Sequence, residues 1–568
     1  MRAAVLALFL ASAAAAATPP TAWVAADPVF PPLIAELERS MSGLALEDVR
    51  PYYLAYKIVD QRRVIVEASL GALKTSYEDR RRLAGADLRV GSAAFDNTDF
   101  IGADGGGHAP FTIQVPYEDG PLSLRHALWW LSDAAFKSAH QRWSQKDAFR
   151  RAKNRPELLP DLTPAPVAVV DALGTSAALA RSRAEADVRR ASAVFAKYPA
   201  LHGGRAAVYA WEDTVRFADS EGRRQRRDAA RFQVVLVAWT QAPDGTALSQ
   251  ERKLYARGAA DLPSSEFLSA QARELAGELA ALSAAPAMER PYIGPVLFEG
   301  QAAGEFFNQL LAHGLEAPRE LWLEDESQRH TYAPGPLTGR LELRVASPLL
   351  SAYDDPTQAA FAGTALNGYA PLDDEGVPAR RVDLVEKGIL KDLPLGRTPA
   401  RERSGSNGHS RASLEHLPTP RTACLFIEAA GGLSGPALRA ELNRRAAELG
   451  LPFGVVVRRL AADISVSPGS LLAAPLYAVK LYPDGREEPL RGAVFDEVGT
   501  RALRDVVAAG SERRAYNFEQ GGPYGSDDDN VPASVVHPDA LVSELVLVPL
   551  EREPDRLPYL PSPLAARK

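Results

Sequence analysis

Two short stretches of this chain hold side chains that could ligate a metal ion or transfer a proton. The first, at residues 294–316, reads GPVLFEGQAAGEFFNQLLAHGLE and contains Asn308, Gln309 and His313. An imidazole can ligate a metal or exchange a proton near neutral pH. The simpler interpretation of His313 is a histidine at a helix end that hydrogen-bonds a carbonyl group. The alternative is a residue that contacts a peptide in an open cleft.

Both stretches also contain carboxylate side chains, which are potential metal ligands. Glu299 and Glu305 flank the predicted helix of the first stretch and could supply ligands, although glutamates at a helix start usually stabilise its N-terminus. The second stretch, DDEGVP, contains Asp373, Asp374 and Glu375. These three are most simply turn residues, and the alternative is that they line a site.

The signatures of several common enzyme classes do not occur in the chain. It has no G-x-S-x-G elbow, Walker A loop, H-E-x-x-H helix or paired C-x-x-C. These patterns mark many serine hydrolases, nucleotide enzymes, zinc peptidases and zinc ribbons. The function must therefore be inferred from other features.

The N-terminal half has the periodicity of helices packed on a sheet. Residues 52–95 alternate between apolar and polar side chains, as half-buried antiparallel strands do. Helical spacing predicts helices at 123–143, 176–198 and 264–282, and a hairpin is predicted from 206–222 and 228–239. In the third helix, Phe267 is predicted to face inward together with the leucines. Helices on one side of a sheet give an α+β domain.

The C-terminal half is predicted to be mostly β. Helical periodicity stops at residues 284–291, where Pro286 and Pro291 break the pattern, so an N-terminal α+β domain at 18–285 is followed by a β-rich domain at 286–550. Turn signals separate many strands there, which predicts a large curved antiparallel sheet. Two helices interrupt it, at 301–315 and at 436–450, and Leu449 is predicted to face inward. The tail at 551–568 is predicted to be disordered.

Composition and the first residues predict an exported protein. Residues 1–17 have the charged start, the short apolar stretch and the small residues of a signal peptide, so the mature chain should begin near Thr18. No apolar run reaches the roughly 20 residues of a membrane-spanning helix. The formal net charge of −7 without a concentrated basic face argues against nucleic acid as a partner. We expect the protein in the periplasm or outside the cell, with its single cysteine, Cys424, buried in a strand.

Three segments of the C-terminal half occur in a characteristic order. They are the stretch from Gly294, LDDEGVPARRVDLVEKGILKDLPLGR from Leu372 and SNGHSRASLEHLPTPR from Ser406. In order and spacing they resemble the TldD/PmbA family of metallopeptidase-like proteins. In that family the first segment carries H-E-x-x-x-H on a helix, the second is a D-D-E-G-x-P turn before a strand pair, and the third is N-G-rich and ends P-x-P-R. Weaker similarity includes residues 88–100 and 531–547.

The metal motif departs from the pattern of the resembled family. Asn308 and Gln309 stand where that family has histidine and glutamate, and only His313 is kept. The family's third ligand is a late cysteine, but the matching stretch NFEQGGPYGSDDDNVPASV has none, and Cys424 lies elsewhere. Catalytic zinc needs three protein ligands, and a glutamine cannot act as the general base, so zinc is not expected here. The i, i+5 spacing also requires a distorted turn, for which Ala312 offers no special flexibility.

Members of the resembled family that lack the zinc motif form the non-catalytic half of a heterodimer around a peptide channel. The leading hypothesis is therefore an exported, catalytically degenerate subunit that binds unstructured peptide. It would act as a homodimer or as a heterodimer with a zinc-bearing TldD-like subunit. One alternative is an active metallopeptidase whose rearranged metal site uses His313, a neighbouring glutamate and a third residue. Another is a non-enzymatic envelope scaffold or peptide-binding protein.

Overall fold

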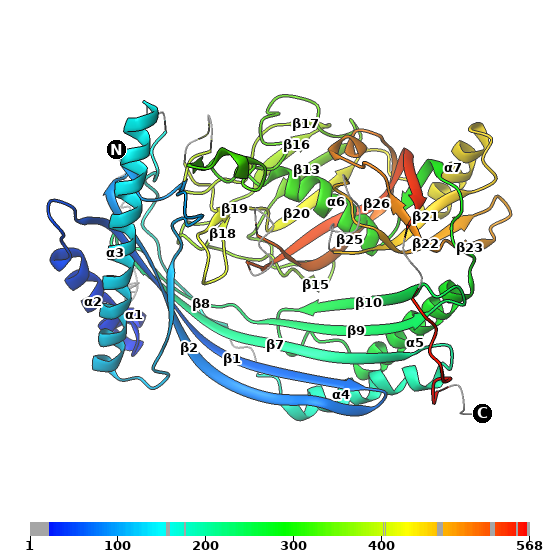
Figure 1. Ribbon diagram of the computed structural model, residues 1–568, viewed down its shortest axis with the longest axis horizontal. Coiled ribbons are helices and arrows are strands. Elements are labelled where there is room, and N and C mark those ends of the chain that lie inside the picture. The colour runs from blue at the N-terminus through cyan, green and yellow to red at the C-terminus, as the bar shows by residue number, and fades with distance from the viewer. Residues whose placement is uncertain are drawn as a thin grey trace, which may run out of the picture.

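The computed structural model describes residues 22–154, 159–174, 178–400, 403, 405–462, 470–522, 529–551 and 555–564. The predicted signal peptide at 1–17 lies outside the described residues. In the described part, the chain forms two large sheets. Helices and a long curved sheet make up the N-terminal half, and the C-terminal half lies over the other side of that sheet (Figure 1). This agrees with the predicted α+β class.

The N-terminal sheet is nine-stranded, and its main path has the order β10-β9-β7-β1-β2-β3. Its strands are β1 (Pro51–Ser69), β2 (Ala72–Ser92), β3 (Phe95–Asp96), β5 (Phe111–Val115), β6 (Val169–Ala172), β7 (Gly203–Asp219), β8 (Arg224–Asp228), β9 (Arg231–Gln241) and β10 (Ala247–Ala256). All pairings are antiparallel except that of β6 with β8. The predicted hairpin is formed by β7 and β9, with β8 inserted where the chain turns.

Helices cover one side and one end of this sheet (Figure 1). They are α1 (Ala22–Ala26), α2 (Phe30–Gly43), α3 (Pro121–Lys153), α4 (Arg181–Ala193) and α5 (Ser265–Ala284). Ser264 caps α5 by accepting the Phe267 N–H at 3.2 Å. The buried stripe of α5 runs through Leu268, Leu275 and Leu279, whereas Phe267 is 48% exposed. The prediction for Phe267 was wrong because it lies about 100° around the helix from Leu268.

The C-terminal sheet has eleven strands, and its main path has the order β17-β16-β13-β20-β26-β11-β21-β22-β23. Its strands are β11 (Tyr292–Phe298), β13 (Leu350–Asp354), β16 (Val382–Glu386), β17 (Ile389–Leu390), β20 (Cys424–Ala429), β21 (Gly454–Leu460), β22 (Pro475–Leu481), β23 (Glu487–Pro489), β24 (Ala493–Phe495), β25 (Val506–Gln520) and β26 (Val531–Pro549). The predicted antiparallel sheet is thus mixed, because β11 pairs with β21 and β20 with β26 in parallel. Cys424 is fully buried at the start of β20, as predicted.

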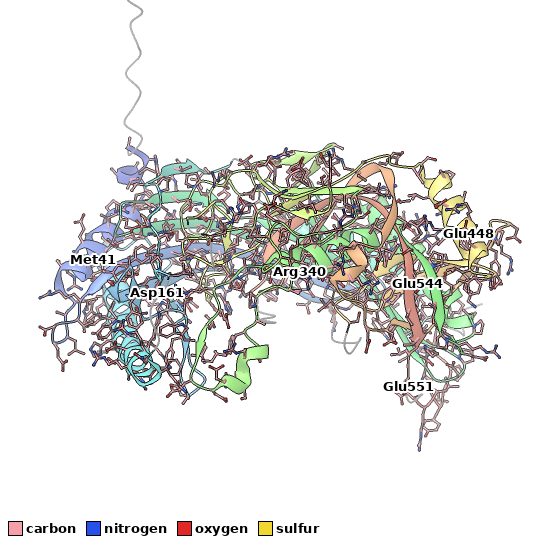
Figure 2. The ribbon with its side chains drawn as sticks, turned by 90° about the horizontal axis from the view of Figure 1, so that it is seen from above. Met41, Asp161, Arg340, Glu448, Glu544 and Glu551 are labelled. Atoms are coloured by element: carbon pink, nitrogen blue, oxygen red, sulfur yellow. The ribbon has the colours of Figure 1, made fainter. Side chains whose placement is uncertain are left out.

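Two helical segments pack on the C-terminal sheet. One begins as α6 (Gln301–Phe307), continues as a π-helical turn at Asn308–Ala312 and ends as a 3₁₀ turn at His313–Leu315. The other is α7 (Gly435–Glu448), at the opposite end of the molecule from α2 (Figure 2). Leu449 follows α7 and is 53% exposed, so the prediction that it faces inward was wrong because the helix ends before it. None of the described helices combines the length and apolar character needed to cross a membrane.

Ion pairs join the N-terminal sheet to the C-terminal half. Lys57 of β1 contacts Asp374 at 2.8 Å, and the buried Arg397 contacts Glu221 at the same distance. The predicted domain boundary at residues 285 and 286 lies in the connection between α5 and β11, and it stays a prediction. In the tail, Asp555 donates its N–H to the carbonyl of Gly245 at 3.1 Å, and the predicted disorder there is likewise untested.

Candidate functional site

The helical segment after β11 presents one polar cluster on an otherwise apolar element. Phe306, Phe307 and Leu310 of this segment are fully buried in the core of the C-terminal half. Its π-helical turn is closed by the His313 N–H, which donates to the carbonyl of Asn308. Such a turn brings residues five apart toward one face, so the distorted turn expected for an i, i+5 pair is present although Ala312 replaces a glycine.

Glu305 is the centre of the polar cluster. It is 1% exposed, and its Oε2 accepts the amide Nδ2 of Asn308 and the amide Nε2 of Gln309, each at 3.0 Å. Its Oε1 accepts the hydroxyl of Tyr516 at 2.6 Å. Burial, and next the Glu305 carboxylate, raise the pKa of Tyr516 well above its ordinary value. Glu305 is therefore a hydrogen-bond acceptor for three donors and not a helix-start glutamate.

Gln309 is held by its remaining polar contacts. Its Nε2 also donates to the carbonyl of Ala461 at 2.8 Å, and its Oε1 accepts the N–H of Ala473 at 2.8 Å. Both ends of the Gln309 amide thus join the π-helical turn to the chain around β21 and β22. Asn308 Oδ1 is buried without a partner among the described residues.

His313 contacts a carboxylate instead of the predicted carbonyl. Its Nδ1 lies 2.9 Å from Oε1 of Glu316, which also accepts the amide of Gln520 at 2.8 Å. Burial lowers the pKa of His313, but the opposing effect of Glu316, with a smaller one from Glu305, leaves the pKa raised. The side chain is 37% exposed, so it can also meet a ligand from outside.

Glu299 lies outside the Glu305 cluster. It forms ion pairs with Arg439 at 2.8 Å and with Arg458 at 3.3 Å. Together with Gln301 and Tyr516, Glu299 lines a cavity of about 500 Å³ between β10, α5 and the C-terminal half. Tyr516 therefore both lines this cavity and donates its hydroxyl to Glu305.

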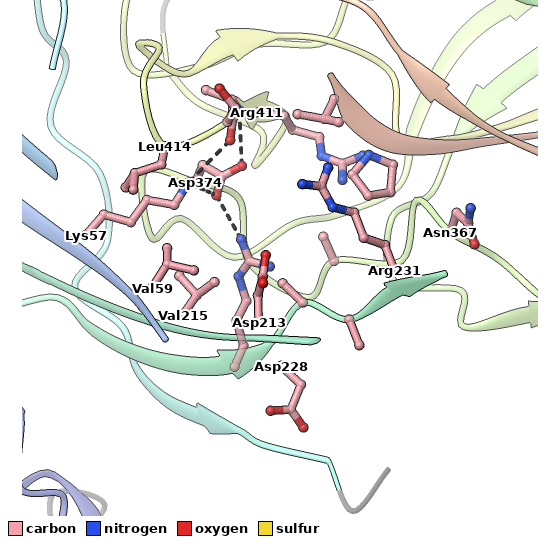
Figure 3. A pocket seen from close by; sticks show the side chains of 18 of the residues that line it. Lys57, Val59, Asp213, Val215, Asp228, Arg231, Asn367, Asp374, Arg411 and Leu414 are labelled. Atoms are coloured by element: carbon pink, nitrogen blue, oxygen red, sulfur yellow. Dashed lines mark hydrogen bonds and ion pairs between the residues drawn. The ribbon is translucent and has the colours of Figure 1, made fainter. Parts of the chain in front are cut away.

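The structure separates the three acidic residues of the DDEGVP turn. Asp373 accepts the backbone N–H groups of Glu375 at 3.0 Å and Val377 at 2.8 Å, as a turn residue does. Glu375 accepts the backbone N–H of Arg397 at 2.8 Å. Asp374 lines a second cavity, between the two halves (Figure 3), and Asp373 also contributes to its lining. Asp373 and Glu375 thus both hold backbone N–H groups of the turn region, and Asp373 and Asp374 border the cavity.

A zinc ion as in the resembled family does not fit the residues at the helix. The amides of Asn308 and Gln309 both donate to Glu305, so their nitrogen atoms offer no lone pair, and the Gln309 oxygen is already bonded. Cys424 lies in a separate apolar cluster with Tyr353 and Phe426. Within the described ranges, no three His, Cys, Asp or Glu side chains are arranged to hold one ion.

Sequence reasoning missed the residues that complete these clusters. Glu316 ends the quoted stretch three residues after His313, so a helical i, i+3 contact could have been considered. Tyr516 is 211 residues from Glu305, and Lys57 is 317 residues from Asp374. No local pattern indicates such contacts, because they depend on the packing of elements that lie far apart in the chain.

Comparison with known proteins matches the C-terminal half to one family. Residues 292–548 match the model of the PmbA/TldA metallopeptidase C-terminal domain. An Archaeoglobus fulgidus protein named metalloprotease is 32% identical over 133 residues, which are 23% of this chain and 28% of that protein. A metalloprotease TldD homolog of Buchnera aphidicola (subsp. Schizaphis graminum) is 24% identical over 258 residues, 44% of this chain and 47% of that protein. The chain thus spans less than half the length of these curated relatives.

Solved structures of similar fold cover nearly the whole chain. TldE from Thermococcus kodakarensis has a TM-score of 0.58 at 13% identity and is matched over 91% of this chain and 100% of its own. A candidate modulator of a DNA gyrase from Thermotoga maritima has a TM-score of 0.59 at 14% identity, over 91% of this chain and 100% of its own. At these identities the likeness concerns the fold.

Proposed function

The chain belongs to the TldD/PmbA family of metallopeptidase-like proteins, and we propose that it is a catalytically degenerate member that binds unstructured peptides. In this proposal it is exported, acts in the periplasm or outside the cell, and supports a zinc-bearing TldD-like partner. The N-terminal signal pattern supports the export part.

One observation supports the proposed loss of catalysis. The amides of Asn308 and Gln309 serve as hydrogen-bond donors to the buried Glu305, at the positions where the family has a metal ligand and a general base. A zinc peptidase needs three protein ligands and a group that accepts a proton from the zinc-bound water. An amide that donates hydrogen bonds supplies neither function. The helix is thereby part of the core's polar network instead of a reaction centre.

Peptide binding is supported by the cavity beside this helix. The cavity of about 500 Å³ is lined by charged and polar side chains from β10 and α5 on one wall and by Glu299, Gln301 and Tyr516 on the other. In the described sheet, β10 is a terminal strand of the main path. An extended peptide can be held along such an edge mainly through its main chain, which makes binding tolerant of sequence.

A rearranged metallopeptidase is the competing candidate. The observation in its favour is that His313 lies 2.9 Å from the Glu316 carboxylate and that Glu305 is near enough to raise the pKa of His313. These three side chains would need to exchange their present partners, Gln520 and Tyr516 among them, to hold a metal. The scaffold alternative lacks a comparable observation.

Metal analysis and peptide binding on the full-length protein test the proposal. After incubation with zinc and dialysis, we expect well under one zinc per chain and no hydrolysis of unfolded peptides. Fluorescence anisotropy should still detect binding of an unstructured peptide, and co-purification from native extract should identify a stoichiometric partner. Stoichiometric zinc with hydrolysis that His313→Ala abolishes would replace the proposal with the metallopeptidase.

The proposed dimer can be tested by a separate measurement of the mass of the protein in solution. We propose a dimer interface formed by residues of about 290–550 around the cleft near His313. Light scattering at micromolar concentration should give roughly twice the chain mass, or a complex with the co-purified partner. A monomer that fails to bind unfolded peptides would leave only the scaffold alternative.

A further inference from the structure

A second cavity lies where the N-terminal sheet meets the loops of the C-terminal half (Figure 3). Its volume is about 170 Å³. Strands β1, β2, β7, β8 and β9 contribute to one wall, and the other wall includes residues of 367–374, 411–414 and 530–532. Apolar side chains contribute to both walls, among them Val59, Val215 and Leu414 (Figure 3). The cavity shares none of its lining residues with the cavity beside Glu299.

Five cationic side chains line this cavity: Lys57, Arg227, Arg231, Arg257 and Arg411. Three of the five have acidic partners. Lys57 and Arg227 each lie 2.8 Å from the same oxygen of Asp374, and Arg231 lies 3.5 Å from Glu519. Asp374 balances only one of the two positive charges of Lys57 and Arg227. One positive charge of these three side chains therefore remains on the wall.

Arg411 and Arg257 have no ion pair within the described part of the chain. Arg411 belongs to the short strand β18 (Ser410–Arg411) and is only 8% exposed, and its Nη1 has no hydrogen-bond partner among the described residues. Arg257 lies over the ring of Tyr369 at 4.6 Å. A buried guanidinium without a counter-ion is costly, because it has lost water and gained no charge in return. Burial accordingly lowers the pKa of Arg411 and also that of Arg257.

Among the described residues, none of the nearby acidic side chains pairs with Arg411, although Asp374 and Asp354 partly oppose the effect of burial on its pKa. Asp374 is engaged by Lys57 and Arg227, and Asp373 accepts backbone N–H groups. Asp213 lies on the wall formed by the N-terminal sheet (Figure 3), where burial raises its pKa to about 6 despite the opposing effect of Arg231. The hydroxyl of Ser413, which also lines the cavity, is buried without a partner in the described residues. An arginine and a hydroxyl therefore remain available to one ligand.

We propose that this cavity binds the carboxylate of a ligand with a small apolar body, with Arg411 as its main partner. A planar guanidinium matches a carboxylate through two parallel hydrogen bonds, and Arg257 adds a second positive charge. The volume is below the roughly 300–1,000 Å³ of clefts that hold drug-sized molecules. The cavity therefore suits a group the size of one amino-acid residue. Two sources have this chemistry: the C-terminal residue of a peptide and a free branched-chain organic acid.

Binding measurements on the full-length chain distinguish these sources. Isothermal titration would use three probes: an N-acetylated peptide ending in leucine with a free carboxylate, the same peptide with a C-terminal amide, and 4-methylpentanoate. Each probe is measured with the wild type, with Arg411→Met and with the matched control Arg501→Met, whose arginine side chain is 80% exposed. We expect a carboxylate probe to bind the wild type and the control equally. Arg411→Met should weaken that binding about 10- to 100-fold, as expected for loss of a charge-assisted pair.

The thermal midpoint shows whether Arg411→Met stays folded. We expect this variant to match or exceed the wild type in stability, because it removes a buried charge that lacks a counter-ion. Binding by the free-carboxylate peptide alone identifies a peptide terminus, and binding by the organic acid as well identifies a small-acid site. Equal affinity of wild type and folded Arg411→Met, or no binding of either carboxylate probe at millimolar concentration, would overturn the proposal. Unchanged binding of the amidated peptide would still support the peptide-binding function proposed above.

Discussion

Replacing Gln309 by glutamate places a second carboxylate against Glu305. The amide Nε2 of Gln309 lies 3.0 Å from Glu305 Oε2 in the buried cluster. If both carboxylates stayed ionised at that separation, their repulsion would be about 5 kcal/mol at an effective dielectric constant of about 20. Keeping one of them protonated at pH 7 costs about 3.7 kcal/mol, from an ordinary pKa of about 4.3 and 1.36 kcal/mol per pH unit. Protonation costs less, so we expect Gln309→Glu to destabilise the protein by about 3–4 kcal/mol at pH 7.

The pH dependence identifies the cause of this destabilisation. The variant carries a glutamate whose pKa is raised by folding, so the folded state binds a proton that the unfolded state releases above pH 4.3. The penalty therefore shrinks as the pH falls, to about 1 kcal/mol at pH 5. Urea unfolding of wild type and variant at both pH values measures it. Gln309→Met, which removes the same hydrogen bonds without a charge, should show no such trend, and Gln141→Glu on the exposed face of α3 should have no effect. Equal stability of Gln309→Glu and wild type at pH 7 would refute the description of Glu305 as a buried acceptor.

Three further predictions concern single side chains and the mature N-terminus. Tyr516→Phe should lower the free energy of unfolding by about 1.5–3 kcal/mol, because it removes a hydrogen bond to a buried carboxylate, whereas Tyr559→Phe, with an 88% exposed ring, should change nothing in the same urea titration. The imidazole of His313 should titrate above about 6.5 by NMR, and Glu316→Gln should lower its pKa. Because the pKa of His313 is raised, the His313–Glu316 pair stabilises the folded protein at low pH, and this stabilisation is lost as the pH rises through the pKa of His313. An unchanged pKa of His313 in Glu316→Gln would contradict the contact. The intact mass of exported protein should correspond to a chain beginning near Thr18, and retention of the first residues would contradict the signal peptide.

Several elements of the N-terminal half could be predicted from local periodicity. The helix expected at 264–282 is α5, and the strand pattern at 52–95 contains β1 and β2. These elements each have one buried face, so their sequences carry the period of that face. The parallel pairings β11 with β21 and β20 with β26 could not be predicted, because strands buried on both faces lack alternation and their partners lie far along the chain.

The candidate site was predicted only in part. The motif comparison placed Asn308, Gln309 and His313 on one helix, and the structure has them in one helical segment, because family motifs are local in sequence. It did not predict that Glu305 would accept hydrogen bonds from two of them and from Tyr516. The partners of Asp374 were missed for the same reason, since Lys57 and Arg227 belong to the other sheet. The chemistry of a buried carboxylate depends on such distant partners more than on its neighbours in the chain.

The position of β26 constrains when the C-terminal half can fold. This strand, Val531–Pro549, follows every other strand in the described chain, yet it pairs with β11, β20, β24 and β25 in the middle of the sheet. Strands separated by more than 200 residues, such as β11 and β26, meet only after a large loss of chain entropy, which slows folding. During synthesis the sheet lacks its central strand until residue 549 has emerged. Until then, β11, β20, β24 and β25 have edges without their partner β26. The C-terminal sheet therefore cannot be completed before residue 549 has been made, and a chaperone that shields those edges until then would raise the yield of native protein.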